Sequence, residues 1–181
     1  MRAMSTPLID KSCQRVDWFT PPHILELVRS YIGGQITLDP ATNAGNYTQA
    51  QTFYHERGLE RMWSGGRSVN CAKNLIWVNP PYGRGLKNWV ARIGNEAAQG
   101  RCIIALLPGN RFETGYIQEN LLKRDPGALC FIRRRLNFCD EHGAPRGGGN
   151  PYGSVLWLFN GPVPQFKRVF SAIGTVVEVK L

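Results

Sequence analysis

Leu75-Ile76-Trp77-Val78-Asn79-Pro80-Pro81-Tyr82 is an apolar run that passes directly into a polar, proline-rich turn. Four consecutive apolar residues before an Asn-Pro step are typical of a short buried strand. In α/β proteins, functional groups gather beyond the carboxyl ends of such strands. The stretch therefore predicts a buried strand at residues 75–78, followed by a loop of functional residues.

The loop after this strand offers hydrogen-bond acceptors to a planar amino group. The side-chain oxygen of Asn79 and the main-chain carbonyl of Pro80 can each accept one N–H of such a group. Pro80 and Pro81 have a fixed φ and no N–H, so they can hold that carbonyl outward. Two acceptors favour a pyramidal nitrogen whose lone pair faces a methyl donor. The pattern indicates methylation of an amino nitrogen, with Tyr82 stacking on its ring; the alternative is an ordinary turn that closes a strand.

Short apolar runs alternate with helical patterns along much of the chain. We expect helices at 23–32, 86–98, 112–122 and 165–173, and strands at 36–38, 75–78, 102–107, 129–132, 155–159 and 175–179. This alternation indicates an α/β fold around a mostly parallel sheet. A Gly/Pro-rich loop, 143–153, joins residues 136–138 to the strand at 155–159 and predicts an antiparallel C-terminal hairpin. Residues 46–74 are mixed, with weak helical character up to about residue 54.

Length and charge limit the organisation and the partners. The 181 residues are 43% hydrophobic, which suits one ordinary core, so we expect a flexible leader at residues 1–15 and a single domain at residues 16–181. With 22 Lys and Arg against 13 Asp and Glu, the formal net charge is +9. Such an excess favours a polyanionic partner, nucleic acid first and an anionic membrane surface second. A basic but passive surface is the alternative.

The chain has five cysteines: Cys13, Cys71, Cys102, Cys130 and Cys139. Their odd number, with no Cys-x-x-Cys pair and no histidine at ligand spacing, predicts reduced thiols and no metal site. The first eleven residues lack the apolar core of a signal peptide, and no stretch approaches the length of a membrane span. We therefore expect a cytoplasmic protein.

Three motifs in order along the chain resemble those of a known enzyme group. They are Asp17-Trp18-Phe19-Thr20-Pro21, Asp39-Pro40-Ala41-Thr42-Asn43-Ala44-Gly45 and Asn79-Pro80-Pro81-Tyr82. Together they resemble the small phage-type DNA N-6-adenine methyltransferases of the Dam family, over roughly residues 16–160. The resemblance implies a Rossmann-like methyltransferase domain, S-adenosylmethionine as methyl donor, and a catalytic loop formed by Asn79, Pro80, Pro81 and Tyr82.

The resemblance assigns the first two motifs to the cofactor. The implied cofactor residues are Trp18, Thr20, Pro21, Asp39, Pro40, Ala41 and Asn43. From its position before a helix with prolines in its first turn, Thr20 is also a plausible N-cap, and Trp18 is also a plausible core aromatic. Asn43 stands where the family has glycine. Because asparagine tolerates left-handed backbone, we expect it to make the turn.

The segment between the cofactor loop and the catalytic strand is short. Only 33 residues, 46–78, separate Gly45 from Asn79, which is too few for two complete βα units, so we expect a trimmed fold. The missing unit normally supplies an acidic ligand for the ribose of the cofactor. Glu56 and Glu60 are candidates for that role, although both also suit a solvated helix.

The resemblance also implies that DNA approaches the same edge of the sheet, with the target adenine flipped out of the stack. It places Arg111 and Phe138 near the base, and Phe138 either stacks on the base or packs in the core. Arg134, Arg135 and Arg146 suit phosphate contacts, although charged runs are also common on solvated faces.

The expected function is therefore methylation of adenine N6 in duplex DNA. The expected setting is the cytoplasm of a bacterial host, with a phage or prophage gene whose product shields DNA from restriction. The same catalytic motif serves methyltransferases of cytosine N4, RNA adenine and protein glutamine. A catalytically inactive nucleic-acid-binding protein of the same fold is the remaining alternative. The sequence indicates neither the target site nor whether the protein is a monomer or a dimer.

Overall fold

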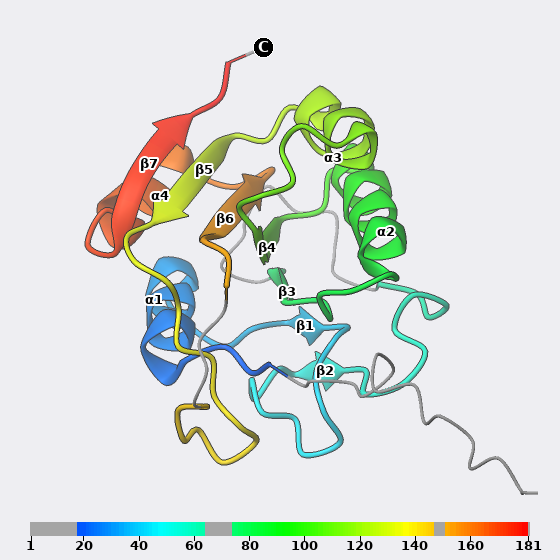
Figure 1. Ribbon diagram of the computed structural model, residues 1–181, viewed down its shortest axis with the longest axis vertical. Coiled ribbons are helices and arrows are strands. Elements are labelled where there is room, and N and C mark those ends of the chain that lie inside the picture. Colours follow the sequence, from blue (N-terminus) through cyan, green and yellow to red (C-terminus); the bar gives the residue numbers. More distant parts are fainter. Residues whose placement is uncertain (1–17, 64–73, 147–150, 181) are drawn as a thin grey trace, which may run out of the picture.

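In the computed structural model, which describes residues 18–63, 74–146 and 151–180, a seven-stranded sheet lies between two layers of helices (Figure 1). The elements are α1 (Pro22–Ile32), β1 (Leu38–Asp39), β2 (Thr52–Phe53), β3 (Ile76–Val78), α2 (Leu86–Ala98), β4 (Ile103–Pro108), α3 (Gly115–Asn120), the 3₁₀ helix η3 (Leu122–Arg124), β5 (Ala128–Ile132), β6 (Ser154–Phe159), α4 (Val163–Phe170) and β7 (Gly174–Glu178). The predicted leader lies outside the described residues, and the single domain stays a prediction.

The strands follow the order β2-β1-β3-β4-β6-β5-β7. Neighbours from β2 to β4 pair in parallel, whereas β6 pairs antiparallel with both β4 and β5, and β7 pairs antiparallel with β5. β5 therefore runs in the same direction as β1 to β4. The α/β class with its parallel first part is confirmed. The predicted antiparallel hairpin is present as well, but β5 forms its first strand rather than residues 136–138.

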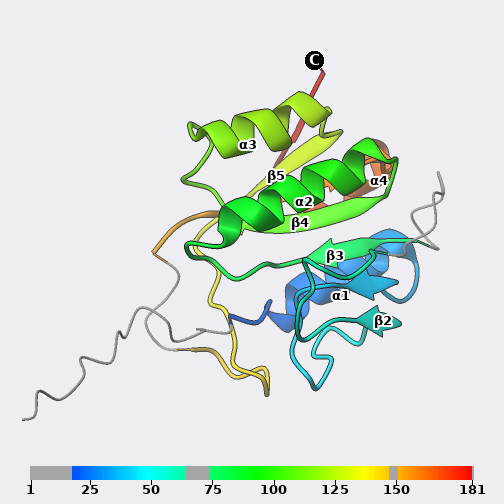
Figure 2. The same ribbon diagram turned by 90° about the vertical axis from the view of Figure 1, so that its right-hand side faces the viewer.

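Both faces of the sheet are apolar because helices cover both (Figure 2). Ile76, Trp77 and Val78 of β3 are all fully buried. Trp77 packs in the core beneath α1 and α4, while Ile76 and Val78 pack in the core beneath α2 and α3. Successive side chains of a strand point to opposite faces, so an uninterrupted apolar run is what a strand covered on both sides requires.

The segment between β1 and β3 differs from the expected weak helix. Asn46 and Gln49 have positive φ, 50° and 53°, and the Asn46 side chain bonds both the N–H and the C=O of Ala50. This turn aligns the chain with β1, and Thr52–Phe53 forms β2 in parallel with it. Among the described residues of this segment β2 is the only strand, which agrees with a trimmed fold.

The structure also bears on the expectations about cysteines, metal sites and membrane spans. Cys130 and Cys139 are free and buried, but Cys102 is disulfide-bonded, so the prediction of reduced thiols is wrong for Cys102. Within residues 18–63, 74–146 and 151–180, no cluster of three or more His, Cys, Asp or Glu side chains forms a metal-binding group. No helix in these ranges has the length and apolarity needed to cross a membrane.

Candidate active site

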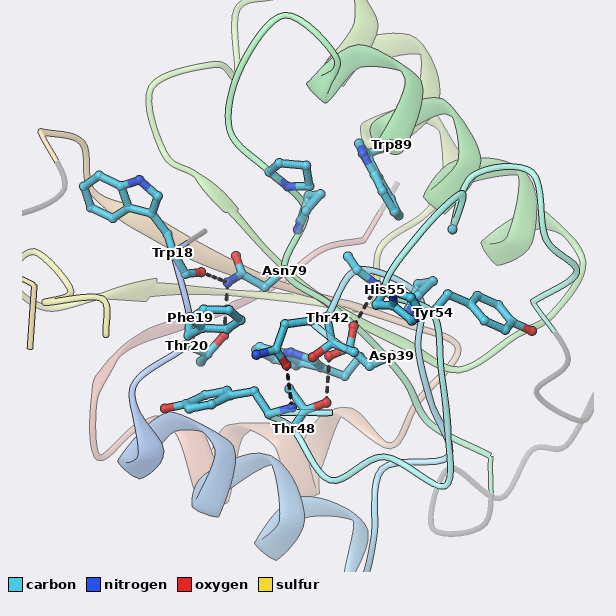
Figure 3. Close-up of a pocket in the computed structure, with 18 of the residues that line it drawn as sticks. Trp18, Phe19, Thr20, Asp39, Thr42, Thr48, Tyr54, His55, Asn79 and Trp89 are labelled. Atoms are coloured by element: carbon cyan, nitrogen blue, oxygen red, sulfur yellow. Dashed lines mark hydrogen bonds between the residues drawn. The ribbon is translucent and has the colours of Figure 1, made fainter. Parts of the chain in front are cut away.

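A cavity of about 280 Å³ opens where β1, β2 and β3 end (Figure 3). Its walls come from the segment before α1, the loop after β1, the chain after β2 and the loop after β3. Parallel strands place their carboxyl ends at one edge of a sheet, where ligands of α/β proteins bind. The cavity brings together all the predicted catalytic and cofactor residues except Pro21, which is buried beside it.

The side chain of Asn79 has a fixed orientation. Its Nδ2 donates to the main-chain carbonyl of Trp18 at 2.9 Å and to Oγ1 of Thr20 at 3.1 Å (Figure 3). Because a carbonyl can only accept, the amide nitrogen must face Trp18. The other end of the amide, Oδ1, is thereby kept as an acceptor for a group that enters the cavity.

The segment Trp18–Thr20, which binds the Asn79 side chain, is itself paired with a residue that is distant in sequence. Phe19 and Cys139 exchange two main-chain hydrogen bonds, 3.1 and 2.9 Å. Thr20 is not the N-cap of α1: Pro21 holds that position, and no side chain caps the helix. The hydroxyl of Thr20 is instead an acceptor for Asn79.

Asp39 is a buried carboxylate at the end of β1, 2% exposed. Its Oδ1 accepts from the N–H of Ala41 at 2.9 Å, and its Oδ2 accepts from Oγ1 of Thr48 at 2.7 Å. Burial raises the pKa of Asp39 to about 6, and the bonds from Ala41 and Thr48 act in the opposite direction. A carboxylate has about four acceptor sites, so Asp39 retains capacity for a cationic ligand. Thr48, which our sequence reasoning missed, holds it in place.

The loop after Asp39 does not turn as expected at Asn43. Among the described non-glycine residues, positive φ is found at Asn46 and Gln49 in this loop, and Asn43 does not share it. Asn43 acts through its side chain instead, because its Oδ1 accepts the N–H of Tyr47 at 3.0 Å. The predicted left-handed conformation at Asn43 is wrong, and the side-chain bond takes over the closure of the loop.

Gly58 forms a close backbone contact with this loop. A Cβ at Gly58 would lie 1.9 Å from the carbonyl oxygen of Pro40, whereas a Cβ at Gly45 would meet only the Asn43 side chain, at an ordinary 3.6 Å. The carbonyl of Gly58 also accepts from Nε1 of buried Trp63 at 2.8 Å, which holds the glycine in place. Gly45, which belongs to the cofactor motif, therefore has room for a side chain. Gly58, which belongs to none of the three motifs, has no such room.

We therefore expect Gly58→Ala to push the Pro40 loop out of place and to weaken binding of the cavity's ligand roughly tenfold or more, because small displacements of binding groups are costly. Gly45→Ala is the matched control and should bind like the unmodified protein. Calorimetric titration of both variants with S-adenosylmethionine, the methyl donor that the sequence resemblance implies, measures the difference. Equal affinities would show that the Gly58 contact does not shape the cavity.

Tyr82 and Phe138 form an aromatic cluster with Trp18. The ring of Phe138 meets Trp18 and Tyr82 edge-on, with centroids 5.4 and 6.0 Å apart, and Tyr82 donates its hydroxyl to the carbonyl of Leu106 at 3.2 Å. Phe138 is 1% exposed and lines neither described cavity. The structure thus places Phe138 in the core, where it supports the two rings that do line the cavity. A stacking role on the base would require it to be exposed.

The arginines predicted to contact DNA lie in different places. Arg111 lines a second cavity beyond Tyr82. Arg134, Arg135 and Arg146 are exposed on the loop after β5 and line neither described cavity. The main-chain N–H of Arg146 donates to the carbonyl of Phe138 at 2.9 Å, so Arg146 lies beside the aromatic cluster.

The two acidic residues predicted as possible ribose ligands, Glu56 and Glu60, lie in different surroundings. Glu56 lines the cavity. Glu60 is exposed and forms an ion pair with Arg57. Only Glu56 is therefore placed to meet a ligand in the cavity.

Comparison with protein families gives a match over most of the chain. The family model described as DNA N-6-adenine-methyltransferase (Dam) matches residues 10–178 of the chain. A search of curated proteins gives no significant match.

Proposed function

Because the chain belongs to the DNA N-6-adenine-methyltransferase (Dam) family, we propose that it transfers the methyl group of S-adenosylmethionine to N6 of adenine in duplex DNA. The observation that carries this proposal is the orientation of Asn79, whose amide nitrogen is engaged by Trp18 and Thr20 and whose Oδ1 is left as an acceptor. In this reading the sheet is a trimmed Rossmann-like methyltransferase fold.

The residues present suit S-adenosylmethionine. Asp39 offers a buried carboxylate for the positive end of the cofactor, and Glu56 offers an acceptor for its hydroxyls. Oγ1 of Thr42 is buried in the wall of the cavity, and no described group bonds to it. Such an orphaned polar atom is costly unless a ligand satisfies it. When bound, the cofactor supplies a methyl group on a sulfonium centre.

The chain's own residues then position the acceptor. Asn79 Oδ1 and the Pro80 carbonyl accept the two N–H groups of the target amino group, so that its lone pair faces the methyl group. Positioning and aligned hydrogen bonds supply the catalysis. The surplus proton leaves the methylated nitrogen for water. Tyr82, held by Leu106 and Phe138, forms the wall against which the base rests.

The experiment is incubation of the purified protein with unmethylated duplex DNA and labelled S-adenosylmethionine, followed by nucleoside digestion and mass spectrometry. N6-methyladenine is the expected product. N4-methylcytosine would retain the mechanism and change the base. No methylated nucleoside, with DNA demonstrably bound, would overturn the proposal in favour of an RNA or protein acceptor or an inactive binding protein.

We further propose that the protein acts in the bacterial cytoplasm as a phage or prophage enzyme that protects DNA from restriction. The net charge of +9 supports a DNA partner. DNA propagated with the active gene should resist endonucleases that N6-methyladenine blocks, and DNA propagated with the Asn79→Ala gene should be cut. Equal cutting of both would contradict this role.

A further inference from the structure

A second cavity, of about 500 Å³, lies on the other side of Tyr82. We call it the basic groove and define it by Tyr82, Arg84, Lys87, Arg111 and Tyr152. Arg84 lies in the loop just before α2, Lys87 lies in the first turn of α2, and Arg111 follows the end of β4. The size lies within the range of about 300–1,000 Å³ that is usual for ligand pockets.

The charge of this groove is uncompensated. Its lining includes three cations and no acidic residue. Some other cations of the described chain form ion pairs: Arg92 and Arg101 with Glu96, Arg57 with Glu60, Lys123 with Glu119, and Lys167 with Glu178.

By contrast, no ion pair within the described residues involves Arg84, Lys87 or Arg111, and all three side chains are exposed. Like charges in one concave site repel each other and focus a positive potential, which a polyanion relieves.

The groove adjoins the candidate active site. Tyr82 lines both cavities, so one ring separates the place where the target base would lie from the three cations. A nucleotide whose base occupies the first cavity has phosphates on both sides of its sugar, and the strand must continue past this wall. Tyr152, 41% exposed, also lines the groove.

We propose that the basic groove binds the phosphates that flank the target nucleotide, so that the strand which delivers the base to Asn79 runs over Arg84, Lys87 and Arg111. This proposal rests on the proposed function for the identity of the strand. The groove, rather than Arg134 and Arg135 on the loop after β5, then supplies the phosphate contacts closest to the reaction.

The test compares two triple variants that remove equal charge. Arg84→Ala/Lys87→Ala/Arg111→Ala empties the groove of cations, whereas Lys123→Ala/Arg124→Ala/Arg168→Ala removes three exposed cations that line neither described cavity. Affinity for a duplex DNA is measured against salt concentration. The groove variant should bind on the order of tenfold more weakly, and the magnitude of its slope of log K against log[salt] should fall by up to about 3, while the control variant should change neither appreciably.

Titration of S-adenosylmethionine and thermal unfolding establish that both variants are folded. Equal loss in the two variants would overturn the groove, because it would reflect net charge alone. An unchanged salt slope in a folded groove variant would also overturn it.

The outcomes also separate the groove from the proposed function. If the unmodified protein methylates adenine and the groove variant binds DNA normally, the groove fails and the function stands. If the unmodified protein methylates nothing and the groove variant still loses its salt slope, the groove stands as a nucleic-acid site and the function fails.

Discussion

Replacing Asn79 with alanine should lower kcat for methyl transfer by roughly a thousandfold or more while leaving the affinity for S-adenosylmethionine within a few-fold of normal. Asn79 is expected to act on the acceptor through Oδ1, and removing one aligned hydrogen-bonding group from a reaction centre costs about 10²–10³ in kcat. The substitution also removes the group that orients the target amino nitrogen toward the methyl donor, and this adds to the cost. Single-turnover methylation rates and calorimetric titration give the two values.

Thr20→Ala is the matched control for this prediction. It removes one of the two acceptors that hold Nδ2 of Asn79 and leaves the carbonyl of Trp18, at 2.9 Å, to fix the amide. Because Oδ1 is retained, we expect a loss of about tenfold at most, in line with one neutral hydrogen bond. If both variants lost activity equally, Asn79 would matter for holding the Trp18–Thr20 segment rather than for catalysis.

The sequence was a good guide wherever a local pattern determined the structure. The apolar run before Asn79 predicted β3, and the amphipathic pattern at residues 86–98 predicted α2 with the observed bounds. Asp39 and Asn79 follow β1 and β3, which pair in parallel, so their meeting at one edge was predictable from topology.

What could not be predicted depends on contacts between distant parts of the chain. Trp18 and Asn79 are 61 residues apart, yet the main-chain carbonyl of Trp18 orients the amide. Because every residue has a main-chain carbonyl, the residue types in the sequence do not predict which carbonyl acts as the acceptor. Gly58 is constrained by the backbone at Pro40, a contact that exists only after β2 has paired with β1.

Phe138 shows the same limit for a residue chosen by resemblance. A motif position gives the residue type but not the depth at which it lies, and Phe138 is buried behind Trp18 and Tyr82. Arg134 and Arg135 were predicted to contact phosphates because they belong to a run of consecutive charges at residues 133–135. Arg84, Lys87 and Arg111 are dispersed in sequence, and only the fold gathers them into one groove.

The pKa of Asp39 makes the stability of the protein depend on pH. Burial raises this pKa from its ordinary 3.8 to about 6. A carboxyl that binds its proton more tightly in the folded state contributes stability that is complete below about pH 4 and is lost as the pH rises through 6. At pH 7 the buried charge therefore costs about 3 kcal/mol relative to the protonated form.

Asp39→Asn should consequently stabilise the protein while impairing cofactor binding. Asparagine has the same shape, its Oδ1 can accept from Ala41, and its Nδ2 can donate to the Thr48 hydroxyl, so both bonds of Asp39 are replaced. We expect a gain of about 1–3 kcal/mol in unfolding free energy at pH 7.5, shrinking toward pH 5 as the native carboxyl of the unmodified protein takes up its proton. Denaturant titrations at the two pH values measure this gap. A constant gap would show that the charge of Asp39 is not the cause.

The same substitution should weaken S-adenosylmethionine binding on the order of a hundredfold to a thousandfold, as loss of one partner in a buried charge pair does. In the unmodified protein, binding near pH 6 should release a proton, because the positive ligand lowers the pKa of Asp39 again. Calorimetry in two buffers of different ionisation enthalpy detects that proton, and Asp39→Asn should abolish it. A stabilised variant with undiminished affinity would mean that the buried charge serves the loop and not the ligand. Joint gain of stability and loss of binding is what a carboxylate held at the end of β1 for a cationic ligand requires.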